Sequence, residues 1–168
     1  MTKHFDFLRN IPCWKPQFKW VEVARDSADL INSWHEDYPT RVEDTLDMML
    51  SYTVSVRVFG VYPFHIRSLI LQDIHSSIFQ DNGDAGQWRQ GEVTVGNHHP
   101  PDHLLVPKFM DELEHESVIK TIEDLTDWYS DLETIHPFRD GNGRVGGVVV
   151  AVVSKAFEHK KGWLTALQ

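Results

Sequence analysis

The chain has 168 residues, with 16 Lys or Arg against 25 Asp or Glu, so its formal net charge is −9. Its 41% hydrophobic and 24% charged residues match a folded globular domain and exclude extensive disorder, and the acidic balance argues against nucleic acid as a partner. The single cysteine, Cys13, excludes an internal disulfide framework, and the longest apolar run, residues 148–153, is too short to cross a bilayer, so we expect a cytoplasmic protein without membrane contact.

The first third of the chain is divided by prolines. Residues 11–20 contain two prolines and two tryptophans, which predicts an extended leader anchored by aromatic side chains. Apolar residues at helical spacing predict a helix over residues 21–35. Residues 41–59 also have helical spacing, but their last part is rich in β-branched residues, so local propensity leaves helix and strand open there.

Two further elements precede residue 101. Residues 64–79 carry apolar side chains at the three-to-four spacing of an amphipathic helix, and the Gly- and Asp-rich residues 81–86 end it. Residues 88–96 alternate between glycines, which predicts a brief strand or one arm of a hairpin.

The last third of the chain contains the clearest helix. Residues 117–135 carry one apolar stripe, with Ser117 as the expected N-cap and Pro137 just beyond the end. Residues 148–157 have the composition of a strand, but their apolar content on all sides fits a buried helix equally well.

The loop between these two segments has the residue types of a phosphate site. Gly141 and Gly143 allow positive φ angles and a concave row of backbone N–H groups, to which Asn142 adds an amide. Asp140 supplies a hard oxygen ligand of the kind that Mg²⁺ prefers, and Arg144 can neutralise phosphate charge.

His136 opens this loop and is the only group in it that exchanges protons near neutral pH. A base, a metal ligand, an anion nest and a guanidinium within nine residues favour phosphoryl or nucleotidyl transfer. Asp-Gly-Asn-Gly is also a good turn and helix-cap sequence, so each residue alone is better explained by structure than by chemistry.

The complete string His136-Pro-Phe-Arg-Asp-Gly-Asn-Gly-Arg144 resembles the signature of the Fic family, His-x-Phe-x-Asp/Glu-Gly-Asn-Gly-Arg. The resemblance extends over about residues 55–160, with a flap at about 88–101 and the signature loop at 136–147. It implies an all-α fold, a Fic-type helical bundle with a small β-hairpin flap, in which residues 148–157 are helical. It also divides the chain into an N-terminal segment, 1–54, and a Fic core, 55–168.

The resemblance further implies transfer of AMP from ATP to a Ser, Thr or Tyr hydroxyl of a target protein, with release of pyrophosphate. His136 would be the base and Asp140 the Mg²⁺ ligand. The phosphate cradle would consist of Gly141, Asn142, Gly143 and Arg144. In the flap, the backbone of Val93, Thr94 and Val95 could pair with an extended target segment by strand addition. An antitoxin or a second copy of the chain are further partners that the family suggests.

The chain departs from the family pattern at Gly147, where a second arginine would hold the γ-phosphate. A short match to the family's inhibitory motif has Ser55 and Gly60 in place but Phe59 where a glutamate would stand, so both partners of the inhibitory ion pair are missing. The loss of a charged phosphate contact leaves two alternatives to AMP transfer. One is an enzyme that uses another nucleotide or activated phosphodiester, and the other is a Fic domain that binds nucleotide or a partner without turnover.

Overall fold

The computed structural model describes residues 25–27, 29–30, 66–79 and 82–166. Residues 25–27 and 29–30 are helical, in agreement with the helix predicted over residues 21–35. The predicted leader, the ambiguous segment 41–59, and Ser55, Phe59 and Gly60 of the degenerate inhibitory motif lie outside the described residues, as does the proposed boundary at residue 54.

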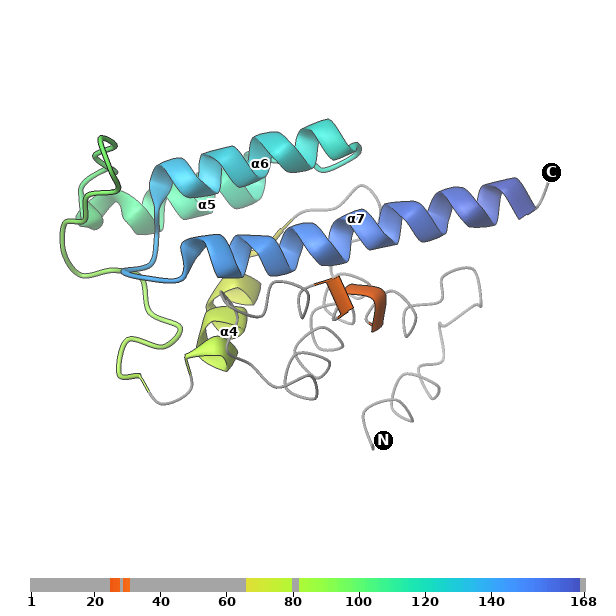
Figure 1. The fold of residues 1–168 in the computed structure, drawn as a ribbon. Helices are drawn as coiled ribbons and strands as arrows, with labels where there is room; N and C mark the ends of the chain where they lie inside the picture. The colour runs from red at the N-terminus through yellow and green to blue at the C-terminus, as the bar shows by residue number, and fades with distance from the viewer. Residues whose placement is uncertain (1–24, 28, 31–65, 80–81, 167–168) are drawn as a thin grey trace.

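The main helices are α4, Ser68–Ile78; α5, Val106–Glu116; α6, Ile122–Ile135; and α7, Asn142–Ala166. A short 3₁₀ turn, η1, covers His103–Leu105. Helix α6 packs against α7 and α5, while α4 packs against α7 and α5. Figure 1 shows α6 and α7 side by side, with α4 on the opposite side of α7. The helical architecture confirms the predicted fold class.

Helix α7 decides the segment that composition left open. Val148, Val149, Val152 and Val153 are fully buried, as is Ala151. A segment buried on several sides needs no polar stripe, so a valine-rich helix is stabilised by packing despite its β propensity. The helical alternative for residues 148–157 is therefore correct.

Helix α6 begins five residues later than predicted. Ser117 is the C-cap of α5, its N–H bonding to the carbonyl of Leu113. Thr121 is the N-cap of α6: its hydroxyl accepts from the Asp124 N–H, and the Asp124 carboxylate accepts from the Thr121 N–H. This reciprocal capping box satisfies two helix-end donors at once, which Ser117 with Lys120 three residues later cannot do.

The segment predicted as a hairpin arm has no regular strand in the part of the chain that the structure describes. Its backbone pairing is an isolated antiparallel bridge between Val95 and His98, with N···O distances of 3.0 and 2.9 Å. Side-chain bonds from Arg89 and His98 to carbonyls elsewhere attach this segment to α6 instead of a strand ladder.

None of the described helices is both long enough and apolar enough to cross a membrane.

Candidate active site

The signature loop begins at the last residue of α6. His136 is the C-cap, with φ 51° and ψ 62°, and its N–H bonds to the carbonyl of Leu132. It is the only described residue other than glycine with a positive φ. This left-handed conformation is unfavourable for a side chain with a Cβ, so the surrounding structure must hold it.

The middle of the loop is fixed by a buried aromatic ring and an amide. Phe138 is fully buried and stacks on His75 at 4.1 Å between ring centroids, with Trp88 at 5.0 Å. Asn142 accepts from the Phe138 N–H and donates to the Phe138 carbonyl, both at 2.8 Å. Each polar atom of the Asn142 side chain thus makes one hydrogen bond within the loop, which fixes the orientation of the amide.

His75 on α4 is hydrogen-bonded to the backbone of the signature loop. Its Nδ1 accepts from the Gly86 N–H at 2.9 Å, so that nitrogen carries no proton. Nε2 then donates to the Asp140 carbonyl at 2.9 Å. Burial is the main cause that lowers the pKa of His75, which agrees with a neutral ring held by two backbone groups.

Gly141 is required where the loop enters α7. Its φ is +84°, and a Cβ at this position would lie 2.4 Å from Cε2 of Phe79. The Gly141 carbonyl accepts from the Val145 N–H, the first hydrogen bond of α7. Gly143 lies in the first turn, where the helix dipole favours anions.

The two charged residues of the predicted phosphate site lie together at this helix end. Arg144 and Asp140 form an ion pair, with 3.2 Å between Nη2 and Oδ2. The other carboxylate oxygen of Asp140 accepts from the Gly141 N–H at 2.8 Å, and the Arg144 guanidinium lies 4.5 Å above the ring of Phe79. The Asp140 side chain is 78% exposed, so its carboxylate is accessible to a metal ion or a ligand.

The electrostatic surroundings keep His136 neutral. Burial is the largest cause that lowers the pKa of His136, and the charges of Arg89 and His98 lower it further. The Glu133 carbonyl and the Asp140 carboxylate act in the opposite direction. The carbonyl does not reach hydrogen-bond geometry, because Nδ1 is buried without a bonded partner among the described residues. A neutral imidazole can accept a proton from a hydroxyl group.

Residues 66–153 match the model of the Fic/DOC family. The chain belongs to the Fic/DOC family. Its fold is similar to the crystal structure of a Fic family protein from Desulfovibrio desulfuricans G20, with a TM-score of 0.53 and 17% identity. That match covers 95% of this chain and 55% of the other, so this chain spans about half the length of that solved protein.

The structure brings most of the predicted Fic site together. His136, Asp140, Gly141, Gly143 and Arg144 lie in one loop and the first turn of α7. Gly147, where the family has its second arginine, follows one turn later on α7 and is half-buried. The predicted roles of these residues in binding and catalysis remain predictions.

The predicted target-binding residues of the flap lie directly before the turn at residues 96–97, near the end of α6. Val93 is half-buried, and Thr94 and Val95 are exposed. His98, the bridge partner of Val95, reaches the carbonyl of Thr134 at 2.9 Å and so connects the turn to α6. Val93 also lines a cleft of about 580 Å³, together with Arg139 of the signature loop. Arg139 is 77% exposed and forms an ion pair with Asp84, with 3.5 Å between Nη1 and Oδ2.

Sequence reasoning missed an acid beside the helix end. A Cβ on Gly143 would lie 3.9 Å from Oε1 of Glu133 and 3.8 Å from the Tyr129 hydroxyl. Glu133 Oε1 is buried without a hydrogen-bond partner among the described residues, and burial raises the pKa of this carboxyl. Burial and the Glu133 charge likewise raise the pKa of Tyr129. In the sequence Glu133 looks like an ordinary polar position of an amphipathic helix, and Tyr129 belongs to its apolar stripe.

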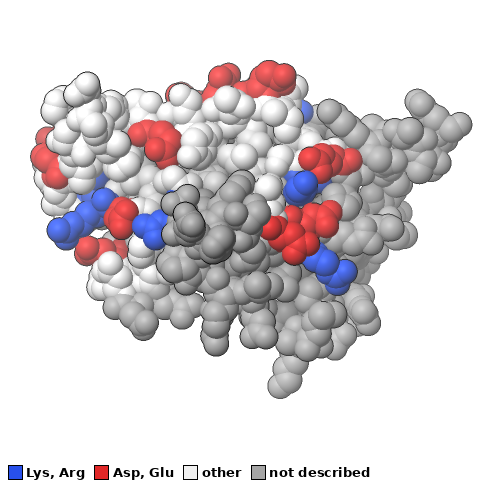
Figure 2. Space-filling view, in the orientation of Figure 1, with Lys and Arg blue, Asp and Glu red and all other residues white. Residues whose placement is uncertain are grey.

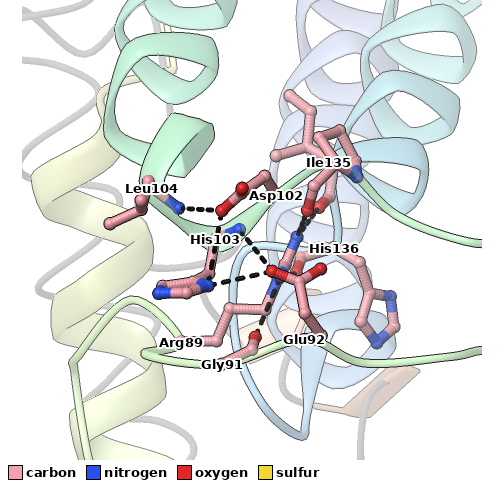
Figure 3. A network of polar contacts seen from close by, with 9 residues as sticks. Arg89, Gly91, Glu92, Asp102, His103, Leu104, Ile135 and His136 are labelled. Atoms are coloured by element: carbon pink, nitrogen blue, oxygen red, sulfur yellow. Dashed lines mark hydrogen bonds and ion pairs between the residues drawn. The ribbon is translucent and has the colours of Figure 1, made fainter.

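Arg89 was also missed. It is 3% exposed, and its guanidinium donates to main-chain carbonyls around the signature loop (Figure 3). Nothing in the sequence separates this arginine from the solvated Arg139, because burial of a charge depends on tertiary contacts.

Proposed function

We propose that this Fic protein transfers AMP from ATP to a Ser, Thr or Tyr hydroxyl of a target protein. The observation that carries the proposal is the half-buried His136, whose pKa is lowered chiefly by burial, directly before a loop that leads into the N-terminus of α7, where the helix dipole favours an anion. The complete nine-residue signature and membership of the family agree with it.

In the proposed reaction His136 takes the proton of the attacking hydroxyl. The hydroxyl oxygen forms a bond to the α-phosphorus of ATP, the bond between this phosphorus and the bridging oxygen breaks, and pyrophosphate leaves with the electron pair. The first turn of α7 and the Arg144 guanidinium would stabilise negative charge that develops on the phosphate oxygens. His136 needs no rearrangement to act as a base, because burial already favours its neutral form.

The residues at this helix end fit a magnesium ion. Mg²⁺ in nucleotide sites is usually bound by one or two carboxylates together with phosphate oxygens. Asp140 offers an exposed carboxylate directly before the anion-binding helix terminus, and we propose that it is the protein ligand. When bound, Mg²⁺ would supply charge neutralisation on the triphosphate. Asp140 would then exchange its pairing with Arg144 for the metal, which leaves the guanidinium to a phosphate oxygen.

Gly147 favours one alternative, a donor other than ATP. Without an arginine at this position the family contact to a γ-phosphate is missing. A donor with a shorter or different leaving group would therefore lose less binding affinity than ATP does. A non-catalytic nucleotide-binding protein is the other outcome to be distinguished.

The test is incubation of the purified protein with Mg²⁺, cell lysate and each of the four α-labelled nucleoside triphosphates. We expect label on protein with ATP. The label should disappear with His136→Ala and persist with the control His115→Ala, which removes an exposed histidine of α5. Label from another triphosphate alone would identify that nucleotide, instead of ATP, as the donor. Absence of label with all four triphosphates, given a folded protein, would contradict nucleotidyl transfer.

A further inference from the structure

Arg89 is a buried cation whose acceptors are backbone groups. In the described residues every hydrogen bond of its guanidinium goes to a main-chain carbonyl (Figure 3). Burying a guanidinium is costly unless its donors are satisfied. A buried position with this many backbone bonds therefore indicates that the arginine organises the chain around it.

The bonds of Arg89 are concentrated on the turn that contains His136. Nη2 donates to the Ile135 carbonyl at 3.4 Å and Nε donates to the His136 carbonyl at 2.8 Å. The backbone N–H of Arg89 donates to the Pro137 carbonyl at 2.8 Å. One residue thus binds three consecutive carbonyls at the point where α6 ends and the chain turns left-handed.

The same guanidinium also binds the flap segment near both of its ends. Nη1 donates to the Gly91 carbonyl at 3.0 Å and Nη2 donates to the Pro101 carbonyl. Residues 91 and 101 stand at the two ends of the flap segment that contains Val93, Thr94 and Val95. Arg89 therefore links both ends of the predicted target-binding segment to the turn of the predicted base.

These contacts explain how His136 keeps an unfavourable backbone conformation. The last carbonyls of a helix lack intrahelical donors and form the negative end of its dipole, which a cation stabilises. Charge-assisted bonds to the Ile135 and His136 carbonyls supply both donor and charge. In Figure 3 the His136 ring points away from Arg89, so the backbone is held while the imidazole is left to the signature loop.

We propose that Arg89 is a positioning residue for His136, which holds the backbone of residues 135–137 in the left-handed turn and joins it to the flap segment. The kinetic effects expected of this positioning role rest on the proposed function. The effect of Arg89 on the conformation and titration of His136 does not. In this role Arg89 makes no hydrogen bond to the imidazole and acts through the main-chain carbonyls that it binds.

The charge of Arg89 gives the proposal a second readout. The charged groups that face His136 are Arg89 and His98, which lower its pKa, and Asp140, which raises it. Loss of the cation at position 89 should therefore raise the pKa of His136, so that the imidazole takes up a proton at higher pH. A purely structural residue elsewhere in the core would not move this titration in a defined direction.

The experiment titrates the protein labelled with ¹³C-histidine by NMR, without nucleotide, and assigns His136 by its absence in His136→Ala. Arg89→Met should raise the pKa of His136, and the control Lys108→Met, which removes an exposed cation of α5, should leave it unchanged. An unchanged His136 titration in a folded Arg89→Met variant would overturn the proposal.

Arg89→Lys keeps the positive charge but removes the several N–H donors of the guanidinium. It is also the variant to use if Arg89→Met does not fold. One amine keeps the charge but cannot bind the four carbonyls that the guanidinium reaches, so we expect the pKa of His136 to stay near that of the wild type. In the α-label assay kcat should fall at least tenfold with little change in KM for the nucleotide. Wild-type kcat in Arg89→Lys, or a parallel loss of nucleotide affinity, would overturn the positioning role. Absence of transfer by the wild type would contradict the proposed function, and the titration would still decide the role of Arg89.

Discussion

At the scale of single residues, the site fixes two histidines in different ways. His75 has both ring nitrogens bonded to backbone groups, so its tautomer is set by hydrogen bonds. The Nδ1 of His136 is buried without a bonded partner among the described residues, and burial is the largest of the causes that lower the pKa of His136. The first arrangement suits a structural support and the second suits a group that must change protonation state.

Glu133 gives a prediction on stability. Burial raises the pKa of Glu133, so its ionised form disfavours the fold at neutral pH. Glu133→Gln should therefore raise the free energy of unfolding at pH 7 by about 1 kcal/mol. Because the folded-state pKa is raised, the gain should decline as pH falls and vanish below the ordinary glutamate pKa of about 4.3. Urea unfolding at several pH values measures this, with Asp131→Asn as an exposed control on α6. A gain that is the same at every pH would contradict the account.

Asp140 gives a prediction on metal dependence. If its carboxylate is the magnesium ligand, Asp140→Ala should remove the effect of Mg²⁺ on nucleotide affinity measured by calorimetry. Asp73→Ala, an exposed change on α4, should keep that effect. Retained Mg²⁺ dependence in Asp140→Ala would place the ligand elsewhere.

At the scale of elements, the helix ends determine the site. Helix α6 ends at Ile135, with His136 as its C-cap, and α7 begins at Asn142, so the loop between them is short and bound at both ends. The two helices also approach closely, since a Cβ on Gly146 would lie 2.7 Å from Cε2 of Tyr129 and 3.1 Å from Cδ2 of Leu132.

This close approach predicts that Gly146→Ala is harmful although alanine favours helices. In an open helix the change would stabilise by roughly 0.5–1 kcal/mol. Here the methyl group overlaps the Tyr129 ring, and we expect a loss of roughly 1–3 kcal/mol in the free energy of unfolding. Gly143→Ala on the same helix meets only ordinary contacts and is the control. Equal stability of the two variants in urea unfolding would show that the helices can separate without cost.

The sequence predicted the elements better than their limits. Apolar spacing located α4 and α6, but the start of α6 depended on a choice between two hydroxyl residues that only the Asp124 carboxylate resolves. The loop from His136 to Arg144 was predicted because its residue types are unusual together. Arg89 and Glu133 were missed because their importance comes from burial, which depends on helices and loops distant in sequence.

At the scale of the whole molecule, the signature loop joins the C-terminus of α6 to the N-terminus of α7 in a protein of acidic composition. On the face shown in Figure 2, acidic and basic side chains of the described residues are interspersed and form no large basic patch. This agrees with the net charge of −9. Under the proposed function, a nucleotide would therefore be attracted locally, by the helix terminus and Arg144, rather than by the overall field.

Gly147 predicts how a nucleotide stabilises the whole fold. A ligand that binds only the folded state stabilises it by RT ln(1 + c/Kd), where c is the free ligand concentration, so at one ligand concentration tighter binding gives a larger rise in Tm. In a His136→Ala background, which prevents turnover, Gly147→Arg should tighten ATP binding about tenfold or more and leave ADP nearly unchanged. Gly147→Gln, of similar length without charge, is the control. Equal Tm shifts with ATP in all three proteins would contradict a missing γ-phosphate contact.

The most direct test of the central claim compares α-labelled with γ-labelled ATP in the same transfer reaction, with wild type and His136→Ala. We predict that the wild type places the α-label and not the γ-label on a protein, and that His136→Ala places neither while remaining folded. Transfer of the γ-label would contradict nucleotidyl transfer in favour of a kinase reaction, and undiminished α-label with His136→Ala would contradict the role of His136 as the base.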